Sequence, residues 1–196
     1  MVCKVILKLY SPSFFATFIG LKWNLATQIV PRMLIHAHYV GRRPESLPAY
    51  FSLCIYLGIR QWTKICNRVA DYAVRWAEES GDNQLVALTR SMCGWGIHWS
   101  GDVLRAEKFQ KETLFNYGKW MAPRWQIATA NDLVGNNLLI RGYTREALRI
   151  INMGLKTAHQ TKSNGPIAAT EAVALGVYAV GGYESELKET LQDLEK

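Results

Sequence analysis

Close-spaced cysteines are missing from this sequence. Its four cysteines are scattered through 196 residues, none forms a CxxC pair, and none lies within four residues of a histidine. Structural zinc sites usually need such close ligand pairs, so we expect no metal site. Four scattered thiols also fit a reducing compartment better than a disulfide framework, which favours a cytoplasmic protein.

The motifs of common enzyme classes are also missing. The sequence contains no GxSxG, HExxH or Walker-type GxxxxGK(S/T), and no His-x-Glu followed by a cysteine pair. The glycine-rich stretch SMCGWGIHWSGD (91–102) has the spacing GxGxxxxG rather than GxGxxG and lies in helical sequence. Several carboxylates are expected on solvent faces: Glu78, Glu79, Glu107, Glu112 and Glu146. We therefore expect no catalytic residues, no cofactor and no enzymatic activity.

No apolar run is long enough to span a membrane. The N-terminal segment MVCKVILKLYSPSFFATFIGLKW is apolar, but three lysines interrupt it, and the uncharged run from Leu9 to Leu21 has 13 residues. A spanning helix needs about 20 apolar residues, and no small-x-small cleavage site follows a clean apolar core. We interpret residues 1–45 as an apolar helical cap on the core or the remnant of a preceding region; a signal peptide or anchor is the alternative.

Basic residues outnumber acidic ones, with a formal net charge of +7, but they form no dense cluster. Residues 1–80 carry ten Lys or Arg against four Asp or Glu, and Arg42–Arg43 is the only adjacent basic pair in the chain. A nucleic-acid partner is therefore not expected. Attachment of this basic half to nucleic acid or an acidic membrane is an alternative, and such binding would weaken steeply as salt increases.

What the sequence does contain is a helical repeat. Apolar residues recur at spacings of three and four, without strand-like alternation. Two windows, 90–106 and 131–147, align with each other, and fainter copies lie on either side. The turn glycines Gly101, Gly142 and Gly182 are 41 and 40 residues apart. Each unit is predicted to be a helical hairpin whose glycine adopts the left-handed conformation at the turn.

This pattern resembles the tetratricopeptide repeat (TPR). The matching residues are Cys93-Gly94, Ile97, Gly101-Asp102 and Ala106 in the first window, and Val134-Gly135, Leu138, Gly142-Tyr143 and Ala147 in the second. The resemblance implies an all-α fold, a right-handed superhelical stack of about four antiparallel helical hairpins. Two features depart from the family. The spacing of 40–41 exceeds the usual value of about 34, and Arg90 and Asn131 replace the first-helix aromatic residue.

Repeat units of this length resemble the helical segments of large bacterial multidomain signalling proteins, which lie between a kinase or ATPase module and an output module. This chain carries no kinase, ATPase or DNA-binding signature. The resemblance therefore implies a non-catalytic interaction or scaffold module for a protein or peptide partner. One alternative is an inter-domain spacer that joins adjoining domains of a larger protein. Another is a helical domain that binds a small molecule through the surface around His98.

Breaks in the helical pattern predict the domain organisation. A TPR-like repeat domain over 46–196 follows the cap of residues 1–45. Asp82 and Pro123 lie where a helix cap and a first-turn proline belong, and Ser163-Asn164-Gly165-Pro166 is a break between units. The predicted hairpins cover about 46–80, 82–119, 123–162 and 166–196.

The resemblance also implies a partner site, since the first helices of stacked hairpins line a concave side. Their outward positions are predicted to be Ser91, Trp95, His98, Trp99, Asp132, Asn136 and Asn137. Exposed tryptophans would be strong partner anchors, although burial of one or both against the adjoining hairpin is an equal alternative. Some repeats of this family hold a partner's C-terminal carboxylate with a Lys/Asn pair. Asn136 fits the asparagine position, but Asp132 stands at the lysine position, which puts carboxylate capture in doubt.

Overall fold

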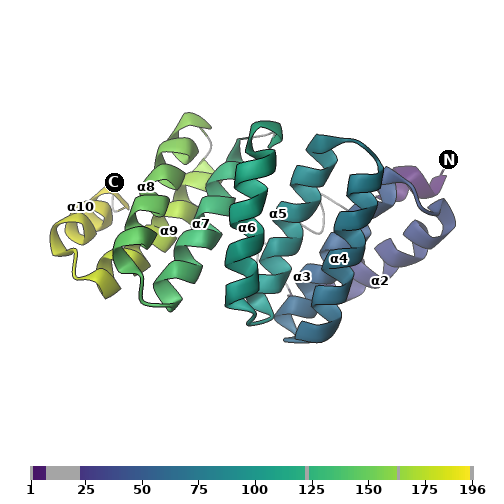
Figure 1. The fold of residues 1–196 in the computed structure, drawn as a ribbon, viewed down its shortest axis with the longest axis horizontal. Coiled ribbons are helices and arrows are strands. Elements are labelled where there is room, and N and C mark those ends of the chain that lie inside the picture. Colours follow the sequence, from purple (N-terminus) through teal and green to yellow (C-terminus); the bar gives the residue numbers. More distant parts are fainter. Residues whose placement is uncertain (1, 8–22, 122–123, 163, 195–196) are drawn as a thin grey trace. The chain divides into compact units, whose positions relative to one another are not determined.

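The computed structural model of the chain describes residues 2–7, 23–121, 124–162 and 164–194. Within these ranges every regular element is a helix and no strand is present (Figure 1). The all-α prediction is confirmed. The helices fall into two compact units, Met1–Asp102 and Val103–Lys196.

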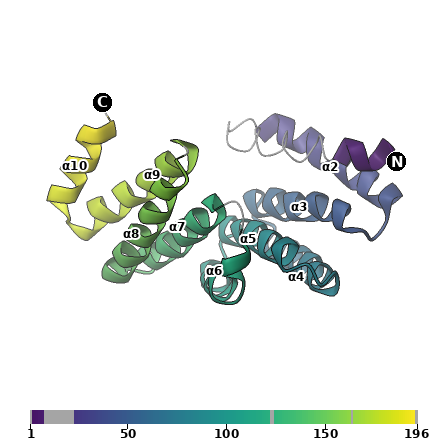
Figure 2. The same ribbon diagram turned by 90° about the horizontal axis from the view of Figure 1, so that it is seen from above.

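The first unit is built around one central helix. Its elements are α2 (Trp23–Val40), the 3₁₀ helix η1 (Pro44–Ser46), α3 (Leu47–Ile59), α4 (Thr63–Glu79) and α5 (Asn83–Trp99), and residues 2–7 are also helical. α3 packs against α2, α4 and α5, and Figure 2 shows it between α2 and the α4–α5 layer. Neighbours on three sides favour apolar residues over most of the surface of a helix.

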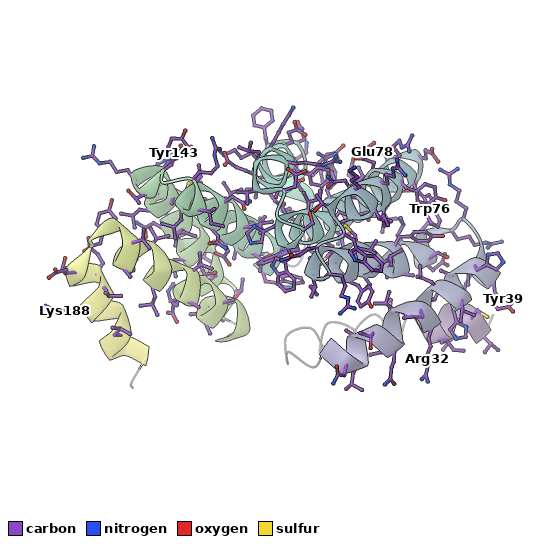
Figure 3. The ribbon with its side chains drawn as sticks, turned by 90° about the horizontal axis from the view of Figure 1, so that it is seen from below. Arg32, Tyr39, Trp76, Glu78, Tyr143 and Lys188 are labelled. Atoms are coloured by element: carbon purple, nitrogen blue, oxygen red, sulfur yellow. The ribbon has the colours of Figure 1, made fainter. Side chains whose placement is uncertain are left out.

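The sequences of these helices match their positions. α3 (LPAYFSLCIYLGI) carries no charged residue. α4 instead has one inward face of small residues, with Cys66, Ala70, Ala73 and Ala77 all 0% exposed. α2 packs on α3 and has Val30 and Met33 buried, and its Arg32 and Tyr39 point outward (Figure 3).

Two small residues allow α3 and α5 to cross closely. A Cβ atom added at Gly58 would lie 2.1 Å from the backbone oxygen of Gly96. A Cβ added at Gly96 would lie 2.7 Å from the backbone carbon and oxygen of Cys54. Any side chain larger than hydrogen would therefore push the two helices apart. This packing therefore requires glycine at Gly96, although glycine weakens the helical pattern of α5.

The second unit repeats the same packing order. Its elements are α6 (Val103–Tyr117), the 3₁₀ helix η2 (Gly118–Trp120), α7 (Trp125–Ile140), α8 (Thr144–Gln160), α9 (Asn164–Gly181) and α10 (Glu184–Leu194). α7 packs against α6, α8 and α9, and α10 packs against α9 (Figure 1). The core contains Val134, Leu138, Ala147, Ile151, Ala174, Val177 and Tyr178.

The turns between helices use a backbone conformation that favours glycine. Gly101, Gly142 and Gly182 have φ of +86°, +81° and +74°. Gln61, which lies 40 residues before Gly101, adopts the same region with φ of +56°. At the α4–α5 junction the Asp82 side chain accepts hydrogen bonds of 2.9 and 3.1 Å from the backbone N–H groups of residues 84 and 85. The predicted cap at Asp82 is confirmed.

Each predicted hairpin range overlaps two helices: α3 and α4, α5 and α6, α7 and α8, and α9 and α10. The boundary between the two compact units falls after Asp102, inside the predicted range 82–119. Pro123 and Ser163 lie outside the described residues. α9 begins at Asn164, so the predicted break does not extend to Pro166, because a proline fits in the first turn of a helix. The division into a cap and a repeat domain stays a prediction.

Candidate functional site

Three of the predicted site residues form one group on α5, which we call the α5 aromatic cluster: Trp95, His98 and Trp99. The Trp95 ring meets the His98 ring at a centroid distance of 6.3 Å and an interplanar angle of 87°. It meets the Trp99 ring at 6.1 Å and 86°. Residues three and four apart share a helix face, and edge-to-face geometry is favoured by aromatic quadrupoles. All three residues are partly exposed.

Ser91, one turn before Trp95, lies elsewhere. It is buried, with 0% of its surface exposed, so the prediction that it points outward is wrong. α5 packs against both α3 and α4, which leaves little of its circumference for the surface. Partner binding by the α5 aromatic cluster stays a prediction.

The predicted site residues on α7 belong to the second unit. Asn136 is partly exposed, whereas Asp132 is 2% and Asn137 0% exposed. The outward placement of Asp132 and Asn137 is therefore wrong. α7 has α6, α8 and α9 as neighbours, and helices on several sides bury positions that a simple repeat pattern assigns to the surface.

Asp132 is a buried acid, and few hydrogen bonds compensate its carboxylate for the loss of water. Its Oδ2 accepts a 2.9 Å hydrogen bond from Thr170 Oγ1 of α9, and its Oδ1 has no hydrogen-bond partner among the described residues. Burial raises the pKa of Asp132 to about 7, against the lowering effect of the Thr170 hydrogen bond. A Cβ at Gly154 of α8 would lie 3.2 Å from Oδ1, so glycine leaves room for the carboxylate. Such a site would repel a partner's carboxylate when Asp132 is ionised.

A charged network ties α6 to the turn between α7 and α8. Arg141 Nη1 donates to Glu107 Oε2 at 2.6 Å. Lys111 Nζ donates to Glu107 Oε1 at 2.9 Å and to Glu146 Oε1 at 3.4 Å. Glu107 is 7% exposed, so the expectation that it lies on a solvent face is wrong. Burial opposes its ionisation, but hydrogen bonds from Lys111 and Arg141 outweigh that effect and lower the pKa of Glu107. A carboxylate held ionised in this way is suited to structure rather than to proton transfer.

The sequence analysis missed a pair of facing cysteines. Cys54 of α3 and Cys66 of α4 place their Sγ atoms 3.5 Å apart, and both residues are 0% exposed. A signal for the pair exists in the sequence. Each cysteine lies six residues from Arg60, which is in the turn, so an antiparallel hairpin brings the two side by side.

Metal-binding and membrane-spanning features are not found in the described ranges. No three or more His, Cys, Asp or Glu side chains gather there as a metal ion would require. None of the helices in those ranges combines the length and apolar character needed to cross a membrane.

A comparison with solved structures agrees with this architecture. No protein-family model and no curated protein matches the chain. Among solved structures, a crystal structure from Podosopora anserina, described as a putative kinesin light chain with nearly identical TPR-like repeats, superposes with a TM-score of 0.64. The match covers 99% of this chain and 92% of that chain at 12% sequence identity. This chain has a TPR-like repeat fold.

The TPR-like fold explains the packing order within each unit. In the first unit α5 packs against both helices of the preceding hairpin, and in the second unit α9 does the same with α7 and α8. Within each unit, a hairpin thus packs against the helix that follows it, as in other helical repeat proteins. The right-handed superhelix that the resemblance implies stays a prediction.

Proposed function

We propose that this TPR-like chain is a non-catalytic interaction or scaffold module that binds a protein or peptide partner through the α5 aromatic cluster. The observation that supports this proposal is the packing of two partly exposed tryptophans edge-on to each other, with a histidine beside them. Tryptophan is enriched among the residues that dominate binding energy, because its large ring buries much area with few rotatable bonds.

The cluster suits a partner segment that has both apolar and polar groups. Trp95 touches both other rings, so the three side chains support one another before any partner arrives. A surface ordered in advance loses less side-chain entropy on binding. His98 adds a titratable polar group at the edge of the apolar surface, which would favour a partner with a hydrogen-bonding group beside an apolar side chain.

The cellular setting of the module is part of the proposal. The long repeat unit resembles those of bacterial intracellular signalling proteins, and the scattered thiols fit the cytoplasm. TPR-like folds are typically non-catalytic, and the sequence has none of the enzyme motifs considered above. We therefore propose a cytoplasmic scaffold whose partner is a protein, a peptide or an adjoining domain of a larger chain.

The test is capture of partners from a lysate of the source cell with three forms of the chain: wild type, Trp95→Ala/Trp99→Ala, and Trp62→Ala. Trp62 is 53% exposed at the start of α4 and lies outside the cluster, so Trp62→Ala is the matched control for loss of a surface tryptophan. Circular dichroism and thermal melting would establish that all three forms are folded.

We expect a partner that wild type and Trp62→Ala retain and that the double variant loses. Retention by the double variant would refute binding through the α5 aromatic cluster. If Trp95→Ala/Trp99→Ala and Trp62→Ala both fail to capture the partner, the partner adheres non-specifically to exposed tryptophans. If no partner is captured by the wild type, the scaffold proposal loses its support and a spacer role is favoured.

A further inference from the structure

The contact between Cys54 and Cys66 has a geometry that the scaffold function does not require. Their Sγ atoms are 3.5 Å apart. Cys66 Sγ also lies 3.3 Å from the backbone oxygen of Cys54, and Cys54 Sγ lies 3.7 Å from the backbone oxygen of Cys66. Since each sulfur reaches the backbone of the other cysteine, the two helices already stand close enough for a covalent bridge.

We propose that Cys54 and Cys66 form an oxidisable dithiol, which a peroxide converts to a disulfide that joins α3 to α4. A disulfide bond is about 2.05 Å long, so the sulfur atoms must approach by about 1.5 Å. Rotation of the two side chains about their Cα–Cβ bonds can supply such a movement without separating the helices. The four cysteines carry thiols in this structure.

The chemistry balances with hydrogen peroxide as the oxidant. One cysteine, as the thiolate, attacks a peroxide oxygen; the O–O bond breaks, and a sulfenic acid and one water molecule result after protonation. The second thiol then attacks the sulfenic sulfur, the S–O bond breaks, and a second water molecule leaves. Overall, two thiols and one peroxide give one disulfide and two water molecules, with the two sulfurs oxidised and the peroxide oxygens reduced.

The surroundings of the pair limit how fast this reaction occurs. Both cysteines are buried, and Gly96 of α5 lies against Cys54, at a distance of 2.6 Å between its ideal Cβ position and Cys54 Sγ. A small peroxide is therefore better suited to reach the pair than a bulky disulfide reagent. We expect the pair to react more slowly than Cys3, which is partly exposed, but to form a disulfide rather than stop at the sulfenic acid.

The bridge would stabilise the first unit. It would close the loop of residues 54–66, which includes the α3–α4 turn, and restrict the unfolded chain. Loop-closure entropy for a ring of this size shifts the unfolding equilibrium on the order of 100-fold toward the folded state. The hairpin α3–α4 is the surface on which α5 packs, so oxidation would also stabilise the support of the α5 aromatic cluster.

The test is mass spectrometry of the full chain after treatment with hydrogen peroxide, in a Cys3→Ala/Cys93→Ala background that retains only the pair. We expect loss of two hydrogen atoms, disappearance of both thiols, a cross-linked peptide that contains Cys54 and Cys66, and full reversal by dithiothreitol. The same background with Cys54→Ala is the control, and it should gain oxygen at Cys66 instead. Urea unfolding of the oxidised and reduced forms would measure the stabilisation.

Wild-type protein supplies a second measurement if the background variant does not fold. Peptide mapping after peroxide treatment and thiol alkylation distinguishes a bridge between residues 54 and 66 from one that involves Cys93. Both thiols still alkylated after peroxide treatment and unfolding, oxygen added to each sulfur separately, or a bridge to Cys93 would each overturn the proposal. These outcomes do not depend on whether the α5 aromatic cluster binds a partner.

Discussion

Replacement of Asp132 by asparagine should stabilise the second unit at neutral and alkaline pH. The pKa of Asp132 is about 7 in the folded chain, because burial disfavours the carboxylate, and its ordinary value is 3.8. The folded state therefore holds the proton more tightly than the unfolded state does. The contribution of Asp132 to stability is greatest below pH 3.8, falls as the pH rises from there, and levels off above the folded-state pKa near 7.

The size of the effect follows from the shift in pKa. Each unit corresponds to about 1.36 kcal/mol, so a shift of about three units destabilises the folded state by up to about 4 kcal/mol at high pH. About 2–3 kcal/mol of this change falls between pH 5 and pH 8. Asparagine has similar volume and accepts the Thr170 hydrogen bond, but it does not ionise. Asp132→Asn should remove this part of the pH dependence.

The assay is urea unfolding of the full chain and of Asp132→Asn at pH 5 and pH 8. Asp71→Asn, a change of an exposed acid on α4, is the matched control. We expect the difference between Asp132→Asn and wild type to grow by about 2–3 kcal/mol from pH 5 to pH 8, and the difference for Asp71→Asn to stay nearly constant. Parallel pH curves for wild type and Asp132→Asn would refute the argument that an ionised Asp132 is an uncompensated buried charge.

Three further predictions concern backbone geometry, and thermal melting with urea unfolding checks each. Gly142→Val should destabilise the chain by about 1–2 kcal/mol through backbone strain alone, since φ is +81° and no atom lies within 4 Å of a Cβ there; unchanged melting would contradict the turn assignment. Gln61→Gly should stabilise it by about 0.5–1 kcal/mol, because φ of +56° is unfavourable for glutamine, and a loss of stability would show that the side chain compensates for that strain. Gly96→Ala should cost about 1–3 kcal/mol, since its Cβ would lie 2.7 Å from the Cys54 backbone. Gly176→Ala, with its nearest atom at 3.9 Å, is the control, and equal effects at both sites would argue against the close α3–α5 crossing.

The helical turns were largely predictable because their conformations are local. Glycine adopts the left-handed backbone conformation at little cost in free energy. Gly101, Gly142 and Gly182 therefore mark the ends of helices at a regular spacing. Glycine is nevertheless not required at every turn. Gln61 and Lys162 adopt positive φ as well, at +56° and +52°, and no local pattern distinguished them from other polar residues.

The candidate site was only partly predictable, because exposure depends on where neighbouring helices cross. Ser91 and Trp95 are four residues apart on one helix face, yet Ser91 is buried and Trp95 is partly exposed. Asp132 and Asn136 differ in the same way on α7. Periodicity reports the direction of a side chain around the helix axis, but it does not report how far along that axis a neighbour reaches.

Local sequence was thus sufficient for the all-α class, the glycine turns and the cap at Asp82, since each depends on residues within a few positions of one another. Tertiary packing decided which polar residues are buried, it brought Gly58 to Gly96, and it set the 3.5 Å distance between the Sγ atoms of Cys54 and Cys66. Those contacts join separate helices, and their distances depend on how closely the helix axes approach. That separation is set by all the side chains between two helices together, so no single stretch of the sequence contains it.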